Sequence, residues 1–223
     1  MKNISEISTL ELSKYVNSLR RILTGRHFFE HHLYSTASYK IETTDTFNID
    51  KEVYLRYNPE PEIWTVGSIY DKFFWIGSLF RKEKKLSPIH KKEFTVVDIY
   101  IKDYNRENII SFFFKMLEHI EQELNLPLLS KIPIEYIDHS ELEKYKSKNK
   151  KYWLIVKDYP MEEPFYDEKN EIDNRTKKFE IYFVNNGDKA ELAVGGNLDK
   201  NLNPRKLIKG EAQFINKEAL NKR

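Results

Sequence analysis

Residues 80–100, FRKEKKLSPIHKKEFTVVDIY, combine side chains that could bind a nucleoside triphosphate. Arg81 and Glu83 precede a lysine-rich loop, and Phe94 follows that loop at the start of a strongly β-prone run. A guanidinium can donate to two phosphate oxygens at once. A carboxylate can accept a hydrogen bond from the adenine amino group, and an aromatic face can stack on the base. The pattern predicts a β-hairpin that binds ATP.

Asp98 lies within the β-prone run, between Val97 and Ile99. A carboxylate at such a position must face solvent or a ligand, because burying an unpaired charge is costly. Other interpretations stay open for its neighbours. Glu83 could belong to a solvated hairpin tip, and Phe94 could be an ordinary core residue.

The order of predicted elements is helix, strands, helix, strands. Long helices are expected at residues 8–33 and 106–124, and a short one at 140–146. Strands are expected at residues 37–43, 53–57, 72–81, 94–102, 152–157, 177–184 and 190–194. Residues 185–188, Asn-Asn-Gly-Asp, predict the turn between the last two strands. This order favours an α+β fold with a mainly antiparallel sheet flanked by helices.

Length and composition limit the class of protein. A chain of 223 residues, 40% of them hydrophobic, is expected to form a single domain over residues 1–223, with a polar tail at 201–223. No window approaches the roughly 20 apolar residues that a membrane span needs, and we expect no secretory leader. The absence of cysteine excludes disulfides and thiolate zinc sites, and agrees with a cytoplasmic location. The net charge of +2 gives no general indication of nucleic-acid binding.

Four segments in series resemble a known family. Residues 80–94 are similar to motif 2 of the class II aminoacyl-tRNA synthetases, F-R-x-E, a loop, then H-x-x-E-F. Residues 54–60 (YLRYNPE), 157–166 (KDYPMEEPFY) and 178–197 (KFEIYFVNNGDKAELAVGGN) resemble further segments of its Asp/Asn/Lys branch, in the family's order. The resemblance implies a class II synthetase-like core, with the ATP and amino-acid site within residues 53–200.

The resemblance also implies a role for each motif residue. Arg81 would be the catalytic residue, binding the α-phosphate of ATP and the substrate carboxylate together. Glu83 would bind the adenine amino group, Phe94 would stack on the ring, and His90 would approach the outer phosphates.

The same resemblance implies an amino-acid pocket and a metal site. The pocket would be formed by Glu60, Asp98, Tyr100 and Gly195; a carboxylate there can pair with the substrate ammonium, and the glycine allows close approach. Glu180 and Glu191, on strands joined by the 185–188 turn, would hold Mg²⁺, which prefers carboxylate and phosphate oxygens. The alternative for these two glutamates is an ordinary surface position on a strand.

The chain departs from the family pattern at the γ-phosphate end of the site. Ile89 stands where the family has an arginine, and the residues after Gly196 contain no G-x-G-x-x-R, the pattern of motif 3. We also expect no anticodon-binding barrel ahead of the first helix. These departures argue against tRNA as a partner.

Three hypotheses remain. The first is a ligase that activates an amino acid or related carboxylate with ATP and Mg²⁺, then transfers it to a non-tRNA acceptor. The second is a catalytically reduced pseudo-synthetase that binds an amino acid or nucleotide as a regulatory or partner subunit. The third is an unrelated α+β binding domain. By resemblance, residues 8–45 would form the interface of a homodimer, or of a heterodimer with a chain that carries motif 3.

Overall fold

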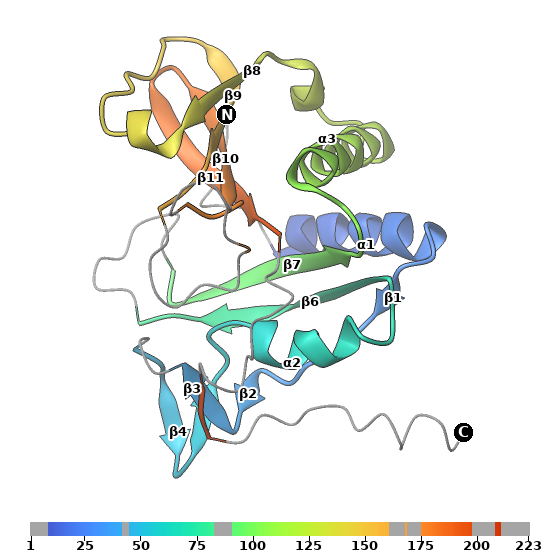
Figure 1. Cartoon of the computed structure of the whole chain (residues 1–223). Coiled ribbons are helices and arrows are strands. Elements are labelled where there is room, and N and C mark those ends of the chain that lie inside the picture. The colour runs from blue at the N-terminus through green and yellow to red at the C-terminus, as the bar shows by residue number, and fades with distance from the viewer. Residues whose placement is uncertain are drawn as a thin grey trace. The chain divides into compact units, whose positions relative to one another are not determined.

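The computed structural model describes residues 9–41, 45–82, 91–160, 168, 175–197 and 208–210. The chain forms two compact units. Unit 1 comprises residues 1–102 and 203–223, and unit 2 comprises residues 103–202. Figure 1 labels most of the helices and strands of both units.

Unit 1 begins with helix α1 (Thr9–Gly25). Leu23 is fully buried in its last turns, and His27, just after the helix, has a positive φ of 62°. The prediction of a helix over residues 8–33 is therefore wrong at its end, because α1 stops at Gly25. The chain continues into the short strand β1 (Phe29–Glu30) instead.

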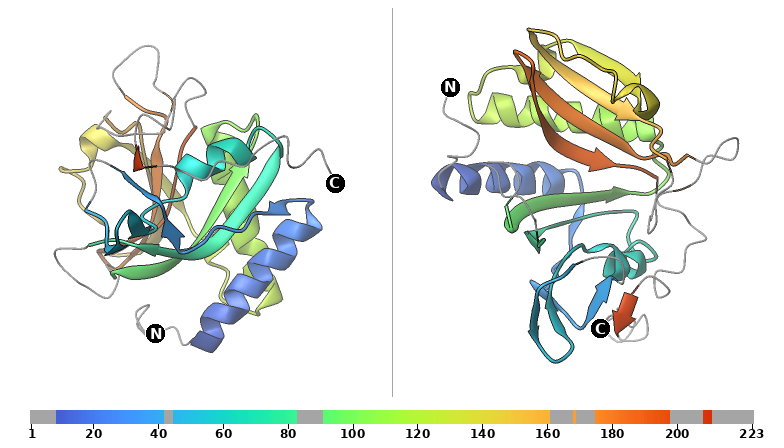
Figure 2. Two further views of the ribbon diagram at one scale, coloured as in Figure 1. Left: turned by 90° about the horizontal axis from the view of Figure 1, so that it is seen from below. Right: turned by 90° about the vertical axis from the view of Figure 1, so that its left-hand side faces the viewer.

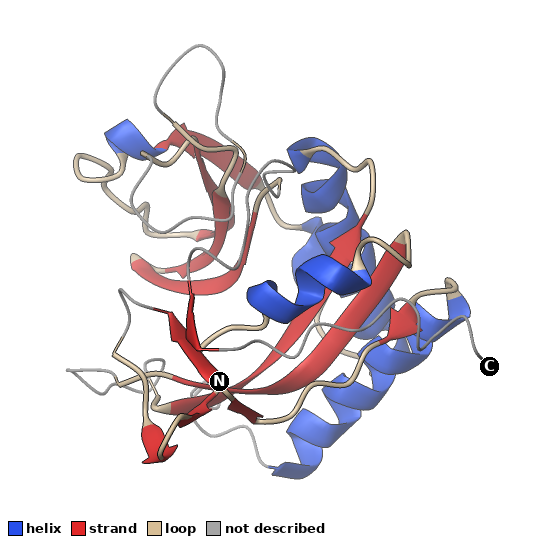
Figure 3. Ribbon diagram, turned by 60° about the horizontal axis from the view of Figure 1, so that its bottom comes forward, coloured by secondary structure: helices blue, strands red, loops and turns tan. Residues whose placement is uncertain are grey.

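The main sheet of unit 1 has the order β1-β6-β7. β6 (Lys72–Phe80) and β7 (Glu93–Ile101) pair as an antiparallel hairpin, from Lys72 opposite Ile101 to Phe80 opposite Glu93. β1 pairs with β6 in parallel. Figure 3, coloured by secondary structure, shows β6 and β7 as the long pair of strands. The hairpin predicted from residues 80–100 is confirmed as far as the described residues reach.

Short strands complete unit 1. β2 (Thr36–Ala37), β5 (Val53–Leu55) and β4 (Asn48–Asp50) form one antiparallel sheet. β3 (Tyr39–Ile41) pairs with β12 (Ile208–Gly210), which comes from the far end of the sequence.

Helix α2 (Glu60–Val66) was not predicted from the sequence. Its seven residues are too few to show a helical period, and Pro59 and Pro61 suggest a loop. Proline is nonetheless accepted in the first turn of a helix, where backbone N–H groups have no helical partner. Ile63 and Val66 are buried against Phe73 of β6, and this packing stabilises the helix.

Unit 2 contains helix α3 (Arg106–Glu123), close to its predicted bounds. Asn105 and Asn108 form a reciprocal capping box that satisfies two backbone N–H groups at the helix start. The short helix expected at residues 140–146 is a single 3₁₀ turn, His139–Glu141.

The sheet of unit 2 has the order β11-β10-β9-β8 (Figure 2). Its strands are β8 (Ile134–Asp138), β9 (Lys151–Lys157), β10 (Phe179–Asn185) and β11 (Asp188–Gly195). β8, which was not predicted, pairs in parallel with β9, and the other pairs are antiparallel. The predicted turn between β10 and β11 is confirmed. Asn186 and Gly187 both have positive φ there, as hairpin turns of this length require.

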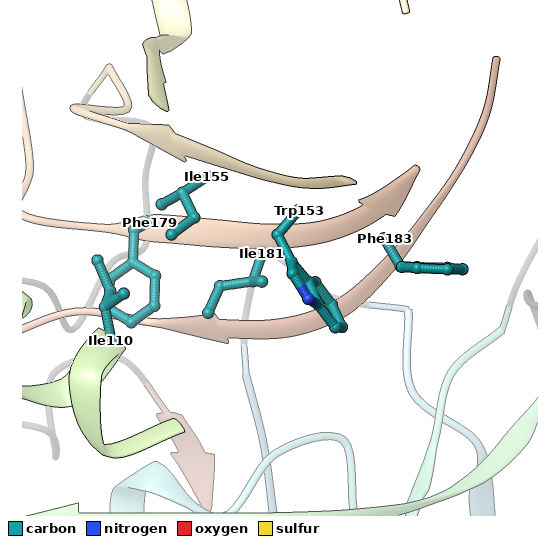
Figure 4. Close-up of a cluster of buried hydrophobic side chains, with 6 residues drawn as sticks. All are labelled: Ile110, Trp153, Ile155, Phe179, Ile181 and Phe183. Carbon is teal, nitrogen blue, oxygen red and sulfur yellow. The ribbon is translucent and has the colours of Figure 1, made fainter. Parts of the chain in front are cut away.

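The two faces of this sheet are packed differently. On one face, Ile110 of α3 packs against aromatic and aliphatic side chains of β9 and β10, as Figure 4 shows: Trp153, Ile155, Phe179, Ile181 and Phe183. On the other face, Tyr152, Leu154 and Val156 are buried with Tyr159 and Val184. These features confirm an α+β fold with mainly antiparallel sheets. No helix among the described residues is long and apolar enough to cross a membrane.

Candidate active site

The predicted site residues divide between the units. Those of unit 1 are Glu60, Arg81, Phe94, Asp98 and Tyr100, and those of unit 2 are Glu180, Glu191 and Gly195. Glu83 and His90 lie outside the described residues.

One face of β7 carries three of the predicted residues. Phe94, Asp98 and Tyr100 are an even number of positions apart on the strand, so their side chains leave the same face of the sheet. Directly opposite them on β6 are Leu79, Trp75 and Phe73, respectively. The strand therefore brings an aromatic ring, a carboxylate and a phenol into one row.

Arg81 follows the last residue of β6, and its N–H donates to the carbonyl of Lys92 at 2.9 Å. The guanidinium lies between two rings, with Cζ 5.1 Å from the centroid of Tyr57 and 5.1 Å from that of Phe94. Arg81 Nε is buried and has no hydrogen-bond partner in the part of the chain that the structure describes. A buried donor of this kind is suited to an anionic ligand.

Tyr57 was missed as a site residue by sequence reasoning, although it lies inside the YLRYNPE segment. Phe80 N–H donates to the carbonyl of Arg56 at 2.9 Å, so this segment is held at the end of β6. That backbone contact brings Tyr57 to the guanidinium of Arg81.

Arg56 fixes the same segment from inside the unit. It is only 2% exposed and pairs with the carboxylate of Glu62, at the first turn of α2. Its Nε donates to the carbonyl of Tyr34 at 2.6 Å, and its terminal nitrogens donate to the carbonyl of Thr36 at 3.0 Å and the hydroxyl of Tyr39 at 3.2 Å. Burial raises the pKa of Glu62, with Arg56 opposing that shift. Arg56 is thus a structural anchor beneath the predicted site.

Among the acids of unit 1 that the structure describes, Asp98 has the pKa that departs most from its usual value. Burial raises its pKa to about 6, and a hydrogen bond from the Tyr100 hydroxyl opposes the shift. The Tyr100 ring is stacked on Phe73, with centroids 4.9 Å apart and planes 7° from parallel. A half-buried carboxylate that is only partly stabilised would gain from a cationic ligand.

Glu60 is the first residue of α2 and is half-buried. Through Ile63 and Val66, this helix covers the Phe73–Tyr100 end of the same sheet face. Glu60 and Asp98 therefore belong to one side of the β6–β7 hairpin.

In unit 2, the carboxylate of Glu180 is held by side chains of its own unit. Glu180 Oε1 lies 2.8 Å from Lys178 Nζ, and Oε2 accepts hydrogen bonds from the hydroxyls of Tyr159, at 2.5 Å, and Tyr182. Burial acts to raise the pKa of Glu180, but these three partners outweigh it and lower the pKa. A metal ion at Glu180 would compete with these three partners for the carboxylate oxygens.

Glu191 does not face Glu180 directly. The ladder of β10 and β11 shifts register between Ile181 and Tyr182, so Glu191 lies opposite Tyr182, and Glu180 lies opposite Val194. Among the residues that the structure describes, no three His, Asp or Glu side chains gather as a metal site.

Gly195 has an internal packing partner. A Cβ at this position would lie 2.8 Å from Cζ of the buried Phe179 ring, closer than real Cβ contacts. The absent side chain therefore makes room for a core aromatic residue, whatever further role the glycine has.

Asp158 and Tyr159, from the segment 157–166 (KDYPMEEPFY), make side-chain contacts within unit 2. Asp158 has a φ of 62°, and its carboxylate lies 2.6 Å from a guanidinium nitrogen of Arg106, at the start of α3. Tyr159 carries the hydrogen bond to Glu180 and lies under Lys178, whose Nζ is 4.4 Å from the ring centroid. The segment connects α3 to the glutamate of β10.

Comparison with solved structures identifies similar folds. The asparaginyl-tRNA synthetase of Pyrococcus horikoshii, complexed with asparaginyl-adenylate, has a TM-score of 0.62 at 14% identity, over 76% of this chain and 49% of that one. The asparaginyl-tRNA synthetase of Entamoeba histolytica has a TM-score of 0.65 at 13% identity, over 82% of this chain and 51% of that one.

Comparison with curated sequences identifies lysine–tRNA ligases. The protein of Blochmanniella floridana is 30% identical over 136 residues, which is 57% of this chain and 27% of that protein. The protein of Dechloromonas aromatica is 33% identical over 119 residues, 50% of this chain and 23% of that protein. The match thus spans about a quarter of these relatives. The sequence model of the family described as tRNA synthetases class II (D, K and N) matches residues 8–198, and the chain belongs to this family.

Proposed function

We propose that the protein activates an amino acid or a related carboxylate with ATP and Mg²⁺. A substrate carboxylate oxygen would attack the α-phosphorus, a new P–O bond would form, and the bond to the β-phosphate oxygen would break. Pyrophosphate would leave with the bonding electron pair, and the product would be an acyl adenylate. The observation that supports this most is the arrangement of Arg81, Phe94 and Asp98 on one side of the β6–β7 hairpin.

Arg81 and Phe94 would bind the nucleotide. The Arg81 guanidinium would donate to the α-phosphate and to the substrate carboxylate, stabilising the negative charge that gathers in the transition state. Phe94 would stack on adenine. Glu83 and His90 keep the roles expected from motif 2, at the adenine amino group and the outer phosphates.

Asp98 and Glu60 would bind the ammonium group of the amino acid, with the Tyr100 hydroxyl beside it. The raised pKa of Asp98 fits this role, because a cationic ligand would restore the charged form that burial disfavours. Gly195 stays a proposed point of close approach for the substrate.

Glu180 and Glu191 stay the proposed carboxylates for Mg²⁺. Because Lys178, Tyr159 and Tyr182 already hold the Glu180 carboxylate, a metal ion would compete with them for its oxygens. The same observation favours the second candidate function, a pseudo-synthetase that binds an amino acid or nucleotide for a partner chain without activating it.

The acyl acceptor would be ammonia, an amine, a thiol or a protein side chain. With 37 basic and 35 acidic residues, the chain offers little general attraction for a polyanion such as tRNA. Transfer of a labelled amino acid to total tRNA would contradict this part of the proposal.

ATP–pyrophosphate exchange, measured with a panel of amino acids and Mg²⁺, tests the function. We expect exchange that depends on one amino acid or a small group of them, and a loss of about 100-fold or more in Arg81→Ala. Lys82→Ala is the matched control, because Lys82 is the neighbouring exposed cation and pairs with Asp45 at 2.9 Å. Absence of exchange in folded protein that still binds ATP would support the pseudo-synthetase instead.

We also propose that the chain dimerises through residues 8–45, with itself or with a chain that carries motif 3. Leu10 and Leu12 of α1 and Phe29 of β1 are exposed apolar side chains in this region. A single monomeric species by light scattering at tens of micromolar would contradict the homodimer.

A further inference from the structure

Trp75 is a large buried side chain of β6. It is 2% exposed and lies directly opposite Asp98 in the antiparallel ladder. Residues directly opposite each other in such a pair place their side chains on the same face, with Cβ atoms about 5 Å apart. The indole therefore shares the sheet face that carries Asp98, Phe94 and Tyr100.

The direction of the indole is shown by Gly77, two residues further along β6. A Cβ on Gly77 would lie 2.3 Å from Trp75 Cζ2 and 2.7 Å from Cε2. The ring thus lies along the strand, over the backbone of Gly77, and points away from the Phe73 end. Gly77 is opposite Val96, which stands between Phe94 and Asp98 on β7. The indole consequently covers the stretch of sheet between Asp98 and the end of the hairpin where Arg81 lies over Phe94.

We propose that Trp75 is a specificity-determining residue that limits the amino-acid site to acids with a short side chain. This inference rests on the proposed function, in which the substrate ammonium pairs with Asp98 and its carboxylate meets Arg81. A substrate held at both points lies above the stretch of sheet that the indole covers. Because Trp75 is almost fully buried, it acts by filling space, and a longer substrate side chain finds no room on the sheet side.

Gly77 is needed for this position of the Trp75 indole. Any side chain at position 77 would collide with the indole, so the glycine allows Trp75 to lie flat on the strand. At 2% exposure the ring would act from beneath the site: the glycine sets how closely the ring approaches the sheet, and the ring sets how far the groups that cover it stand from the sheet.

The experiment is a panel of acids of increasing side-chain length, tested on the wild type, Trp75→Phe, Trp75→Leu and Gly77→Ala. Two readouts are measured: kcat/KM for ATP–pyrophosphate exchange, and stabilisation of the protein by each acid in a thermal melt. We expect the wild type to prefer short acids and Trp75→Leu to shift the long-to-short ratio of kcat/KM about 10-fold or more toward long acids. Gly77→Ala, which pushes the indole away from the sheet, should weaken the binding of short acids.

Two controls separate specificity from folding. Trp153→Phe makes a similar change in the core of unit 2, where Trp153 is 1% exposed, and should lower the melting temperature without changing the preference among acids. In a Trp75→Leu background, Gly77→Ala should lose its effect on short acids, because the indole it displaces is gone. Trp75→Phe keeps the measurement possible if Trp75→Leu does not fold.

The outcomes distinguish this inference from the proposed function. Exchange with an unchanged acid preference in both Trp75 variants would overturn the inference and leave the function standing. Binding without exchange, with a preference that shifts in the variants, would overturn the function and support the inference. If no acid binds to or reacts with any of the proteins, both are wrong.

Discussion

The guanidinium of Arg81 lies over the ring of Phe94, with Cζ 5.1 Å from the ring centroid. The proposed phosphate-binding cation is thus in contact with the proposed adenine-stacking ring. The two residues lie on opposite sides of the hairpin loop, and the backbone bond between Arg81 and Lys92 keeps them together. In the proposed site, the placement of the cation and the binding of the base would therefore be coupled through Phe94.

Phe94→Leu should weaken ATP binding by about 10- to 1,000-fold, measured by calorimetry. Loss of the ring removes base stacking, about 1–3 kcal/mol, and the cation–π contact with Arg81, about 0.5–1 kcal/mol. Phe94→Tyr should bind ATP nearly as well as the wild type. Tyr57→Leu removes only the second ring beside Arg81 and should have a smaller effect. Equal losses in the Phe94 and Tyr57 variants would mean that Phe94 acts only by positioning Arg81.

The pKa of Asp98 predicts a dependence of stability on pH. The unfolded chain releases this proton near 3.8 and the folded chain near 6, so between those values the folded state binds more protons. The contribution of Asp98 to stability must therefore fall as the pH rises from about 4 to 6. Asp98→Asn should gain stability relative to the wild type over this range, measured by urea unfolding at pH 4.5 and pH 7. The exposed Asp71→Asn is the control, and an Asp98→Asn difference that is the same at both pH values would contradict the prediction.

The same group predicts how amino-acid binding depends on pH. The carboxylate that pairs with an ammonium must be charged, so affinity should rise as the pH increases through about 6. Asp98→Asn should bind more weakly and lose this rise. Titration of the amino acid that supports exchange, at several pH values between 5 and 7.5, measures it. A wild-type affinity that is flat over this range would exclude Asp98 as the ammonium partner.

Arg56→Met should destabilise the protein by about 3–5 kcal/mol, because it leaves the Glu62 carboxylate buried without its cation. Lys82→Met, which removes the exposed pair with Asp45, should change the unfolding free energy by about 0–1 kcal/mol. The double variant Arg56→Met with Glu62→Leu should recover part of the loss. Equal effects of the Arg56 and Lys82 substitutions would show that the buried pair is not an anchor.

Lys178→Met should strengthen metal binding at Glu180, by about 10-fold or more. The Lys178 ammonium lies 2.8 Å from Glu180 Oε1, and a hydrogen bond to a charged group contributes about 1.5–3 kcal/mol. Removing it frees a carboxylate oxygen for the ion. Mn²⁺, followed by electron paramagnetic resonance, is a suitable probe. Lys189→Met, which removes a cation lying over the Tyr182 ring, is the matched control. No change in Mn²⁺ affinity in Lys178→Met would count against Glu180 as a metal ligand.

Several features could be predicted from the sequence because their signals are local. The alternating β-prone runs on either side of the lysine-rich loop indicated the hairpin of β6 and β7, and the apolar period of residues 106–124 indicated α3. Asn-Gly between two apolar runs indicated the turn between β10 and β11. In each case the preference for a strand, helix or turn comes from residues close together in the sequence, so it does not depend on tertiary contacts.

Other features depended on contacts between residues far apart in the sequence. The helical conformation of residues 60–66 is stabilised by burial of Ile63 and Val66 against Phe73, and the termination of α1 at Gly25 has no strong breaker signal beyond one glycine. Tyr57 reaches Arg81 only because Phe80 pairs with the backbone of Arg56. Lys178 and two tyrosines hold Glu180, although the sequence showed only a glutamate in a strand.

The sequence by itself determined the family, the α+β class and the residues whose chemistry suits ATP and an amino acid, because residue types and their order along the chain carry that information. Only the tertiary structure decided which of those groups are buried, paired or available. Burial and pairing depend on long-range packing, which sets the pKa of Asp98, covers Gly77 with the indole of Trp75, and gives the Glu180 carboxylate its three partners.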